Sequence, residues 1–258
     1  MIDAGFLASI TEESRNPVDS ATQVPDFALY ADGRVIEPVY LPTVFPGPLL
    51  PSIRQTMVSP AGIQRVLSLA RTDGLANHDQ NYAPASNTDM AVTVITVVVG
   101  GTAVTSRFLA LGTTGTGTDP TEVAARAGSL DFVTKLRGNL DFFGSDQVGT
   151  QQEYVPDTLQ IVAVPSDPSA GVQPSQIVRA PLAWPLATPL SEFGTGLPAG
   201  SSSAARCGVI SGTDLKLVWP LLEEATQITG FTSGAITWTL TPLPLLPGQP
   251  SSCSSGPS

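Results

Sequence analysis

The chain has 258 residues, enough for one large domain or two small ones, and its hydrophobic fraction of 41% excludes wholesale disorder. The net charge is −10 with only 12 Lys and Arg residues, which argues against nucleic-acid binding because a phosphate backbone is bound by clustered basic residues. Charged residues make up only 13% of the chain, a low fraction that we associate with exported proteins.

The N-terminal residues 1–23 show no clear hydrophobic period, and we predict a flexible tail. They lack the basic start and the long apolar run of a signal peptide, so we expect the export signal to be missing from this sequence. No segment of the chain approaches the ~20 apolar residues of a membrane-spanning helix. Order is predicted to begin at residue 24, with two strands around Asp32-Gly33, because an Asp-Gly turn supplies the positive φ angles of a type I′ hairpin.

A strand and a helix are predicted after a proline-rich extended segment. Residues 53–58 show a strand pattern. Ser59 and Pro60 predict a helix start, with Ser59 as the N-cap and Pro60 at the first helical position. Apolar residues recur at helical spacing over residues 60–72, and Gly74 is predicted to end the helix.

The middle of the chain predicts a second hairpin and a second helix. Runs rich in β-branched residues on either side of Gly100-Gly101 predict the hairpin. The sequence DPTE predicts the start of a helix over residues 119–137. Its predicted apolar stripe consists of Val123, Ala127, Leu130, Val133 and Leu136 or Arg137.

A strand over residues 158–165 is predicted next. The stretch from residue 166 to residue 205 is rich in Pro, Ser, Gly and Ala. We expect it to pack against the core and not to be free, because the large aromatic residues Trp184 and Phe193 interrupt its small and polar residues.

A strand–helix–strand unit is then predicted over residues 206–246. Ser211 and Asp214 have the spacing of a capping box, and an apolar stripe predicts a helix that Gly230 ends. A long alternating strand is predicted to follow it, with Thr residues on one face and apolar residues on the other.

This unit resembles the earlier one. Setting Ser211 on Ser59 aligns the apolar stripes of the two helices without a gap. We therefore interpret the units near residues 53–111 and 206–246 as a pseudo-repeat, with chance agreement between two amphipathic helices as the alternative. Together the elements predict an α+β fold with an antiparallel or mixed sheet, or sheets, and about three helices.

We assign residues 24–246 to a single α+β domain and residues 247–258 to a C-terminal tail. Cys207 and Cys253 bracket the second unit, and we expect one disulfide to staple the tail to the start of that unit if the protein is exported. Two unrelated free cysteines are the alternative. Two thiols alone do not make a structural zinc site.

Four segments resemble an uncharacterised family of exported proteins and lipoproteins of high-GC Gram-positive bacteria: FALYADGRVI, LLPSIRQTMVSPAGIQRVLSLARTDGL, RCGVISGTDL and TPLPLLPGQPSSC. The resemblance covers roughly residues 24–253, and its motifs are turns, caps and prolines. It implies export and, in lipoproteins, an anchor on a lipidated N-terminal cysteine, which this sequence lacks upstream of residue 24. It implies no activity, so no catalytic residue is carried over.

Catalytic and metal-binding chemistry is predicted most readily in the loop from Asp73 to Asp89. A Ser-His-Asp hydrolase would have to use His78, the lone histidine, and no G-x-S-x-G motif occurs. Asp79, Asn77, Asn81 and Asn87 add oxygen atoms that suit Ca²⁺, but the spacing is not that of an EF-hand, and Asp and Asn also favour turns.

Three further patterns have a structural interpretation that we prefer. The adjacent Glu223 and Glu224 would diverge on a helix, which indicates a solvated face and not a glycosidase pair. The Gly- and Thr-rich run over residues 112–118 lacks the Lys of a phosphate-binding loop. The three tryptophans, Trp184, Trp219 and Trp238, could line a ligand groove as aromatic platforms do for sugars. Two of them, Trp219 and Trp238, are predicted to face the core, so we prefer a structural role.

The sequence therefore predicts an extracytoplasmic, non-enzymatic binding or scaffold module that is secreted or associated with the cell envelope. We assign it no catalytic, cofactor-binding or metal-binding residues, with calcium as the weak exception, and expect its unknown ligand to be a protein or a small molecule. The alternative is an exported hydrolase or metal-dependent enzyme that uses the loop around His78.

Overall fold

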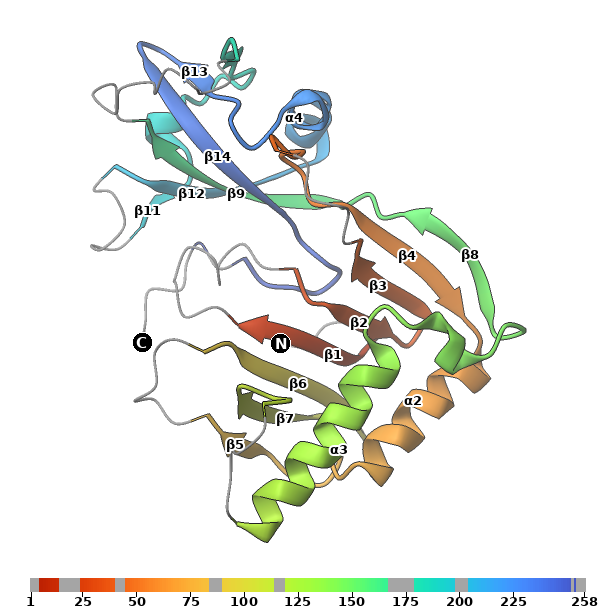
Figure 1. Cartoon of the computed structure of the whole chain (residues 1–258). Coiled ribbons are helices and arrows are strands. Elements are labelled where there is room, and N and C mark those ends of the chain that lie inside the picture. Colours follow the sequence, from red (N-terminus) through yellow and green to blue (C-terminus); the bar gives the residue numbers. More distant parts are fainter. Residues whose placement is uncertain are drawn as a thin grey trace. The chain divides into compact units, whose positions relative to one another are not determined.

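The computed structural model describes residues 5–13, 24–39, 45–83, 90–113, 119–166, 179–197, 204–251 and 253. Across these residues the chain forms α-helices and two β-sheets (Figure 1), which confirms the predicted α+β class. The chain divides into two compact units, Met1–Val39 with Ile53–Tyr154 and Tyr40–Ser52 with Val155–Ser258. Because each unit has its own sheet and its own apolar core, the predicted single domain is divided in two.

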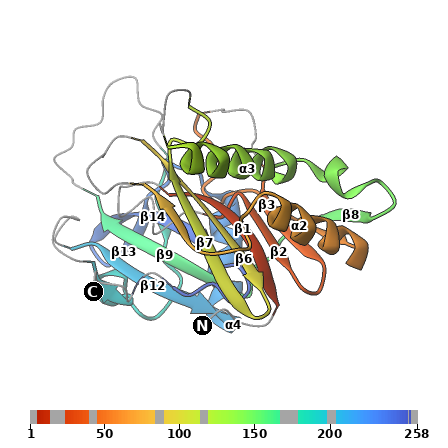
Figure 2. The ribbon, with the colours of Figure 1, turned by 90° about the horizontal axis from the view of Figure 1, so that it is seen from below.

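The first unit is built on an eight-stranded sheet in the order β5-β7-β6-β1-β2-β3-β4-β8. Neighbouring strands are antiparallel except β5 and β7, which are parallel. Helices α2 (Pro60–Thr72) and α3 (Pro120–Leu136) cover one face of this sheet (Figure 2), and the short helix η1 (Leu140–Phe143) follows α3. The strands are β1 (Phe6–Glu13), β2 (Phe27–Tyr30), β3 (Arg34–Pro38), β4 (Ile53–Val58), β5 (Gln80–Tyr82), β6 (Val92–Val99), β7 (Thr102–Leu109) and β8 (Val148–Glu153).

The predicted hairpins and caps of this unit are present, but the turn at Asp32-Gly33 is not the predicted type I′, because Gly33 has positive φ and Asp32 does not. Gly33 has a φ of +91° between β2 and β3, while Gly100 and Gly101 have φ of +58° and +82° between β6 and β7. Glycine adopts this left-handed region without steric cost, so each pair of strands can close tightly. Ser59 and Asp119 are the N-caps of α2 and α3, and each side chain accepts a hydrogen bond from a backbone N–H of the first turn.

Strand β1 shows that the tail predicted over residues 1–23 is wrong for residues 6–13. Phe6–Glu13 pairs with β2 on one side and with β6 on the other, so it lies inside the sheet. Ala8 and Ile10, two residues apart, are completely buried, as the alternation of a strand requires. The strand was missed because few apolar residues alternate before the polar run begins. Residues 14–23 lie outside the described part of the chain.

Helix α3 buries only the C-terminal part of the predicted stripe. Val133 and Leu136 lie in the core as predicted, whereas Val123 and Leu130 are 49% and 41% exposed. Phe132, which was not part of the predicted stripe, is completely buried in the core. Apolar residues occur on more than one side of this helix, so periodicity alone leaves its orientation open.

The second unit is built on a six-stranded sheet in the order β10-β13-β14-β9-β12-β11. Neighbouring strands are antiparallel except β10 and β13. The side chains of α4 (Gly212–Glu224) and of the short helix η2 (Leu190–Glu192) complete the core of this sheet. The strands are β9 (Thr158–Pro165), β10 (Leu182–Ala183), β11 (Thr195–Gly196), β12 (Arg206–Ser211), β13 (Phe231–Ser233) and β14 (Ile236–Pro244).

The C-terminal elements differ from the prediction at two glycines. Helix α4 ends at Glu224, so Gly230 is not its stop, and Ser211 caps it without a side-chain hydrogen bond. The predicted long strand is a hairpin, β13–β14, with Gly234 at a φ of +64° in its turn. Strand β14 pairs with β9 as far as Pro244, so the chain beyond residue 242 is not the loose extension that its prolines suggested.

Prolines are tolerated at the end of β14 because of what lies beside them. Strand β13 pairs with β14 only over residues 236–238, so Pro242 and Pro244 have β9 as their one neighbouring strand. A missing N–H is least costly where a strand is paired on one side. Among the described residues, none of the helices is long and apolar enough to cross a membrane. The pseudo-repeat of the two strand–helix–strand units stays a prediction.

Candidate functional site

The loop that carries His78 connects the end of α2 to β5. Gly74 has a φ of +78° and ends the helix as predicted, and the N–H of Leu75 donates to the carbonyl of Ala70 at 2.9 Å. Leu75 is 1% exposed and lies in the core of the first unit. The chain then enters β5, whose parallel pairing with β7 places it at the edge of the sheet.

The candidate residues of this loop do not converge on one site in the described part of the chain. His78 is exposed. The Asp79 carboxylate accepts a hydrogen bond from the N–H of Thr105 at 2.8 Å, and the Asn81 side chain accepts one from the N–H of Ala83 at 3.1 Å. These are turn and edge-strand contacts of the kind that Asp and Asn commonly make.

Two of the predicted oxygen ligands, Asn87 and Asp89, lie outside the described residues. Within the residues that are described, no three His, Cys, Asp or Glu side chains come together in a way that could hold a metal ion. Asn77, which completes the predicted set, is exposed near Gly74.

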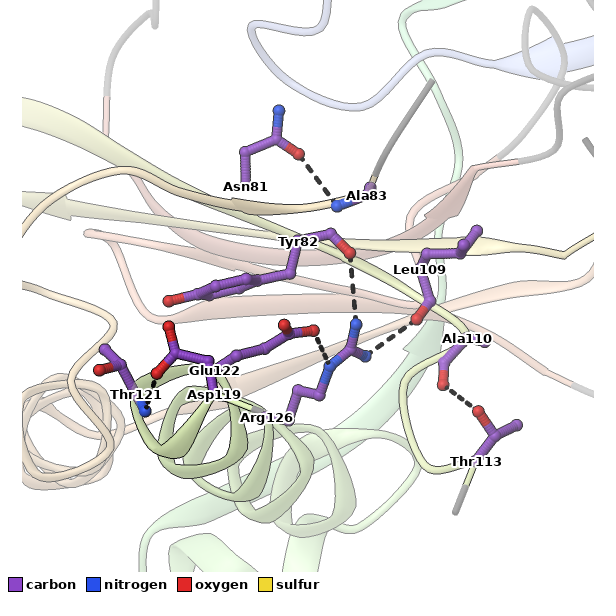
Figure 3. A network of polar contacts seen from close by, with 10 residues as sticks. All are labelled: Asn81, Tyr82, Ala83, Leu109, Ala110, Thr113, Asp119, Thr121, Glu122 and Arg126. Carbon is purple, nitrogen blue, oxygen red and sulfur yellow. Dashed lines mark hydrogen bonds and ion pairs between the residues drawn. The ribbon is translucent and has the colours of Figure 1, made fainter. Parts of the chain in front are cut away.

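Arg126 is the residue that fixes this loop to helix α3 (Figure 3). Its Nη1 donates to the carbonyl of Leu109 at the end of β7 at 2.9 Å, and its Nη2 donates to the carbonyl of Tyr82 at the end of β5 at 3.3 Å. Its Nε lies 2.7 Å from Glu122 one turn earlier on α3. A planar guanidinium can bind three acceptors at once, so a single side chain joins one helix to two strands.

Aromatic contacts reinforce the same junction. The ring of Tyr82 stacks on that of Phe108 with centroids 5.5 Å apart, and the guanidinium of Arg126 lies 5.8 Å from the Phe108 centroid. Phe108 is completely buried and Arg126 is largely buried, with 13% of its side chain exposed. The cation is therefore held against an aromatic face in a partly dry environment, where such contacts are strongest.

Asp73, the C-cap of α2, is the titratable group of this region whose pKa moves furthest toward neutrality. Burial and then the negative charge of Asp131 raise the pKa of Asp73 from 3.8 to about 6, while Lys135 acts in the opposite direction. Asp131 and Lys135 form an ion pair one turn apart on α3. A carboxyl group with a pKa near 6 can exchange a proton at physiological pH, which is the property required of a general acid or base.

A second ionic cluster joins the C-terminal end of α3 to the sheet. Nη2 of Arg137 lies 2.9 Å from Glu12 and 2.6 Å from Asp26, and Glu12 also accepts from the hydroxyl of Thr93 at 2.9 Å. Asp26 is 7% exposed. Sequence reasoning missed this cluster because Glu12 was assigned to a tail, and its pairing depends on β1 lying between β2 and β6.

A buried ion pair links β3 and β4. Glu37, with 2% of its side chain exposed, lies 2.7 Å from Nη2 of Arg54, and the two residues are register partners. Neither residue stood out in the sequence, since opposite charges 17 positions apart become neighbours only once the register is known. Both ionic clusters hold elements of the first unit together.

The remaining sequence candidates have structural roles or lie on the surface. Glu223 and Glu224 are exposed on α4, and Glu223 accepts from the indole N–H of Trp219 at 2.7 Å. Trp238, predicted to face the core, is 2% exposed in the core of the second unit. Trp219, predicted to do the same, is only half-buried against that core, and Trp184 is 8% exposed within it. Of the Gly- and Thr-rich run, residues 114–118 lie outside the described residues.

Residues 179–197, the main described part of the stretch from residue 166 to residue 205, are anchored by two aromatic residues, as expected. Trp184 and Phe193 are both buried, with ring centroids 5.7 Å apart in an edge-to-face arrangement. Gly208 on β12 leaves room for Phe193, because a Cβ on Gly208 would lie 2.5 Å from that ring.

Cys207 and Cys253 form a disulfide, with their Cα atoms 5.1 Å apart. Cys207 lies on β12, and the carbonyl of Cys253 accepts a hydrogen bond from the hydroxyl of Thr195 on β11 at 3.0 Å. Two residues before the cysteine, the hydroxyl of Ser251 donates to Gln160 on β9 at 3.0 Å. Since β12 and β14 are both antiparallel to β9, they run in the same direction, and the chain doubles back after β14 to reach Cys207.

Comparison with protein-family models, with curated proteins and with solved structures finds no match for this chain. Its function is therefore inferred from the contacts described above. The two features that bear on function are the set of contacts around His78 and the disulfide of the second unit.

Proposed function

We propose that this protein is an extracytoplasmic binding or scaffold module and not an enzyme. The observation that supports this most is how the polar groups of the loop that carries His78, and of the helix that contacts this loop, are used. Asp79 accepts from a backbone N–H of β7, and Arg126 donates to backbone carbonyls of β5 and β7. A catalytic acid or base needs a position beside a reacting group, and residues committed to backbone contacts serve the fold first.

The proposed location outside the cytoplasm is supported by the Cys207–Cys253 disulfide. Disulfides persist in oxidising compartments and are rare in the cytosol. The low charged fraction of 13% and the resemblance to exported proteins and lipoproteins favour the same compartment. A module of this kind would bind a protein or small-molecule ligand in the secreted state or at the cell envelope.

An exported hydrolase or metal-dependent enzyme is the second candidate, and Asp73 is the observation that favours it. Its raised pKa, about 6, suits proton transfer, and it lies in the same loop as His78. In such an enzyme the loop would supply the acid or base, and His78 or a bound Ca²⁺ would complete the reaction centre.

A turnover screen distinguishes the two functions. The full chain is assayed with ester, phosphoester, glycoside and peptide substrates, with and without Ca²⁺, alongside His78→Ala and Asp73→Asn. Asp157→Asn, at an exposed turn of the second unit, is the matched control. The module predicts no turnover above the buffer rate in any of these proteins. Turnover that His78→Ala or Asp73→Asn removes and Asp157→Asn retains would establish the enzyme instead.

A further inference from the structure

Five buried side-chain oxygen atoms of the first unit make no hydrogen bond to any other described atom. One is Oγ1 of Thr56 on β4, and the other four are Oδ2 of Asp73, Oε1 of Gln80, Oγ of Ser106 and Oγ of Ser129. Ser106 is 1% exposed and Ser129 is completely buried. Buried polar groups are almost always hydrogen-bonded to protein or to ordered water, so these four require a common explanation if they lie together.

Three of the four residues are placed together by contacts of β5. Gln80 and Ser106 are register partners in the parallel pair of β5 and β7. The side-chain Nε2 of Gln80 donates to the carbonyl of Gly74 at 3.1 Å, which draws the amide to the residue that follows Asp73. Because Nε2 makes that bond, Oε1 is the end of the amide that remains without a partner.

Helix α3 contributes the fourth residue. Its Gly128 lies directly against the backbone of Asp73, since a Cβ there would be 2.5 Å from the carbonyl oxygen of Asp73. Ser129, the next residue, is on the buried side of α3. One turn earlier, Arg126 holds the helix to the carbonyls that end β5 and β7. The four oxygen atoms therefore come from four elements that meet: α2, α3, β5 and β7.

The hydrogen-bonding capacities of the four groups are complementary to a single small molecule. The oxygen atoms of Asp73 and Gln80 accept hydrogen bonds, and the hydroxyls of Ser106 and Ser129 each have one hydrogen to donate. One water molecule donates two hydrogen bonds and accepts two, and buried waters commonly make two to four. We propose that these four side chains enclose one internal water, which links the two helices to the edge of the sheet.

A hard cation such as Ca²⁺ is the other species that these four oxygen atoms could bind. Ca²⁺ would accept lone pairs from all four groups but would leave the hydroxyl hydrogens of Ser106 and Ser129 without an acceptor. It would also prefer six to eight oxygen ligands. A water molecule satisfies both hydroxyls and both acceptors, so we assign water to this site.

Crystal structures of the full chain, grown with and without Ca²⁺, test the assignment. We expect one density peak at about 2.7–3.2 Å from the oxygen atoms of Asp73, Gln80, Ser106 and Ser129, unchanged by Ca²⁺. A peak at about 2.3–2.6 Å that appears only with Ca²⁺ would replace the water by a cation site. Direct hydrogen bonds among the four side chains, with no peak between them, would overturn the proposal.

Solution measurements keep the test independent of crystallisation. In the labelled full chain, a long-lived internal water should transfer magnetisation to the side-chain amide of Gln80, and Ser129→Ala should reduce this transfer at least about twofold by removing one donor. Thr56→Val is the matched control, because Thr56 on β4 also has a buried hydroxyl without a described partner but lies outside this site. No transfer in the wild type, or equal loss in both variants, would contradict the proposal.

Discussion

Gly128 of α3 and Asp73 at the end of α2 touch backbone to backbone, since a Cβ on Gly128 would lie 2.5 Å from the carbonyl oxygen of Asp73 and 3.2 Å from its Cα. Backbone atoms cannot move aside as a flexible side chain can. The absence of a side chain at Gly128 therefore sets how closely the two helices approach.

Gly128→Ala should destabilise the protein, although alanine normally stabilises a helix by about 1 kcal/mol relative to glycine. The added methyl group has to push α2 and α3 apart, and overpacking of this kind costs about 1–3 kcal/mol. We expect a net loss of up to about 2 kcal/mol in the free energy of unfolding, measured by urea denaturation. Thr134→Ala, at an exposed position of the same helix, is the control and should be neutral or slightly stabilising. A Gly128→Ala protein more stable than the wild type would show that the contact is loose.

Asp73 should make stability depend on pH. Its pKa is raised in the folded protein, from 3.8 to about 6, by burial first and then by Asp131. The folded state therefore favours the protonated form, and this stabilisation is complete below about pH 4 and is lost as the pH rises through about 6. Because Asp73 is only half-buried and solvent screens part of its charge, we expect a change of only about 1 kcal/mol.

Asp73→Asn removes that titration, so its advantage over the wild type should grow between about pH 4 and pH 7. Urea denaturation at several pH values measures the difference between the two proteins. Asp157→Asn, at an exposed position, serves as the control and should follow the wild-type pH dependence. Parallel curves for the wild type and Asp73→Asn across this range would contradict the raised pKa.

Arg126 should be difficult to replace even by another cation. Arg126→Ala leaves the carbonyls of Leu109 and Tyr82 without their donor, and we expect a loss of about 1–3 kcal/mol in the free energy of unfolding. Arg126→Lys retains the charge beside Glu122, but an ammonium group lacks the planar fork that contacts two strands, so most of the loss should remain. Hydrogen exchange should rise first in β5. Full stability in Arg126→Lys would reduce the contact to a simple charge interaction.

Local signals predicted the local structure well. The pairs Asp32-Gly33 and Gly100-Gly101 located both hairpins, because the chain there needs positive φ at Gly33, Gly100 and Gly101. The strand over residues 158–165 and the helix over residues 60–72 were predicted with the bounds that the structure has. Each of these depends on neighbouring residues alone, so the sequence contains the necessary information.

Features that depend on distant pairing were not predictable in the same way. Strand β8 was missed because residues 149–153 are exposed and mostly polar, with no alternating pattern to indicate a strand. The three acceptors of Arg126 become neighbours only after β5 pairs with β7 and α3 crosses them. Likewise the contact between Gly128 and Asp73 forms only when α2 and α3 are in place.

The proposed extracytoplasmic role depends most on the disulfide between Cys207 and Cys253. Their separation of 46 residues means that the bond restricts a large loop of the unfolded chain, which contributes roughly 3–4 kcal/mol in the chain-entropy model. We therefore expect Cys253→Ser to lower the free energy of unfolding by about that amount. Ser251→Ala is a milder control, because it removes the hydrogen bonds of the Ser251 hydroxyl to Gln160 and from the N–H of Cys253 but keeps the disulfide.

The most direct measurement is a count of free thiols in the denatured, unreduced full chain after export from a host cell. We predict no free thiol per chain, and two after reduction. Two free thiols per chain without reduction would contradict the cross-link and, with it, the proposed assignment of this protein to an oxidising compartment.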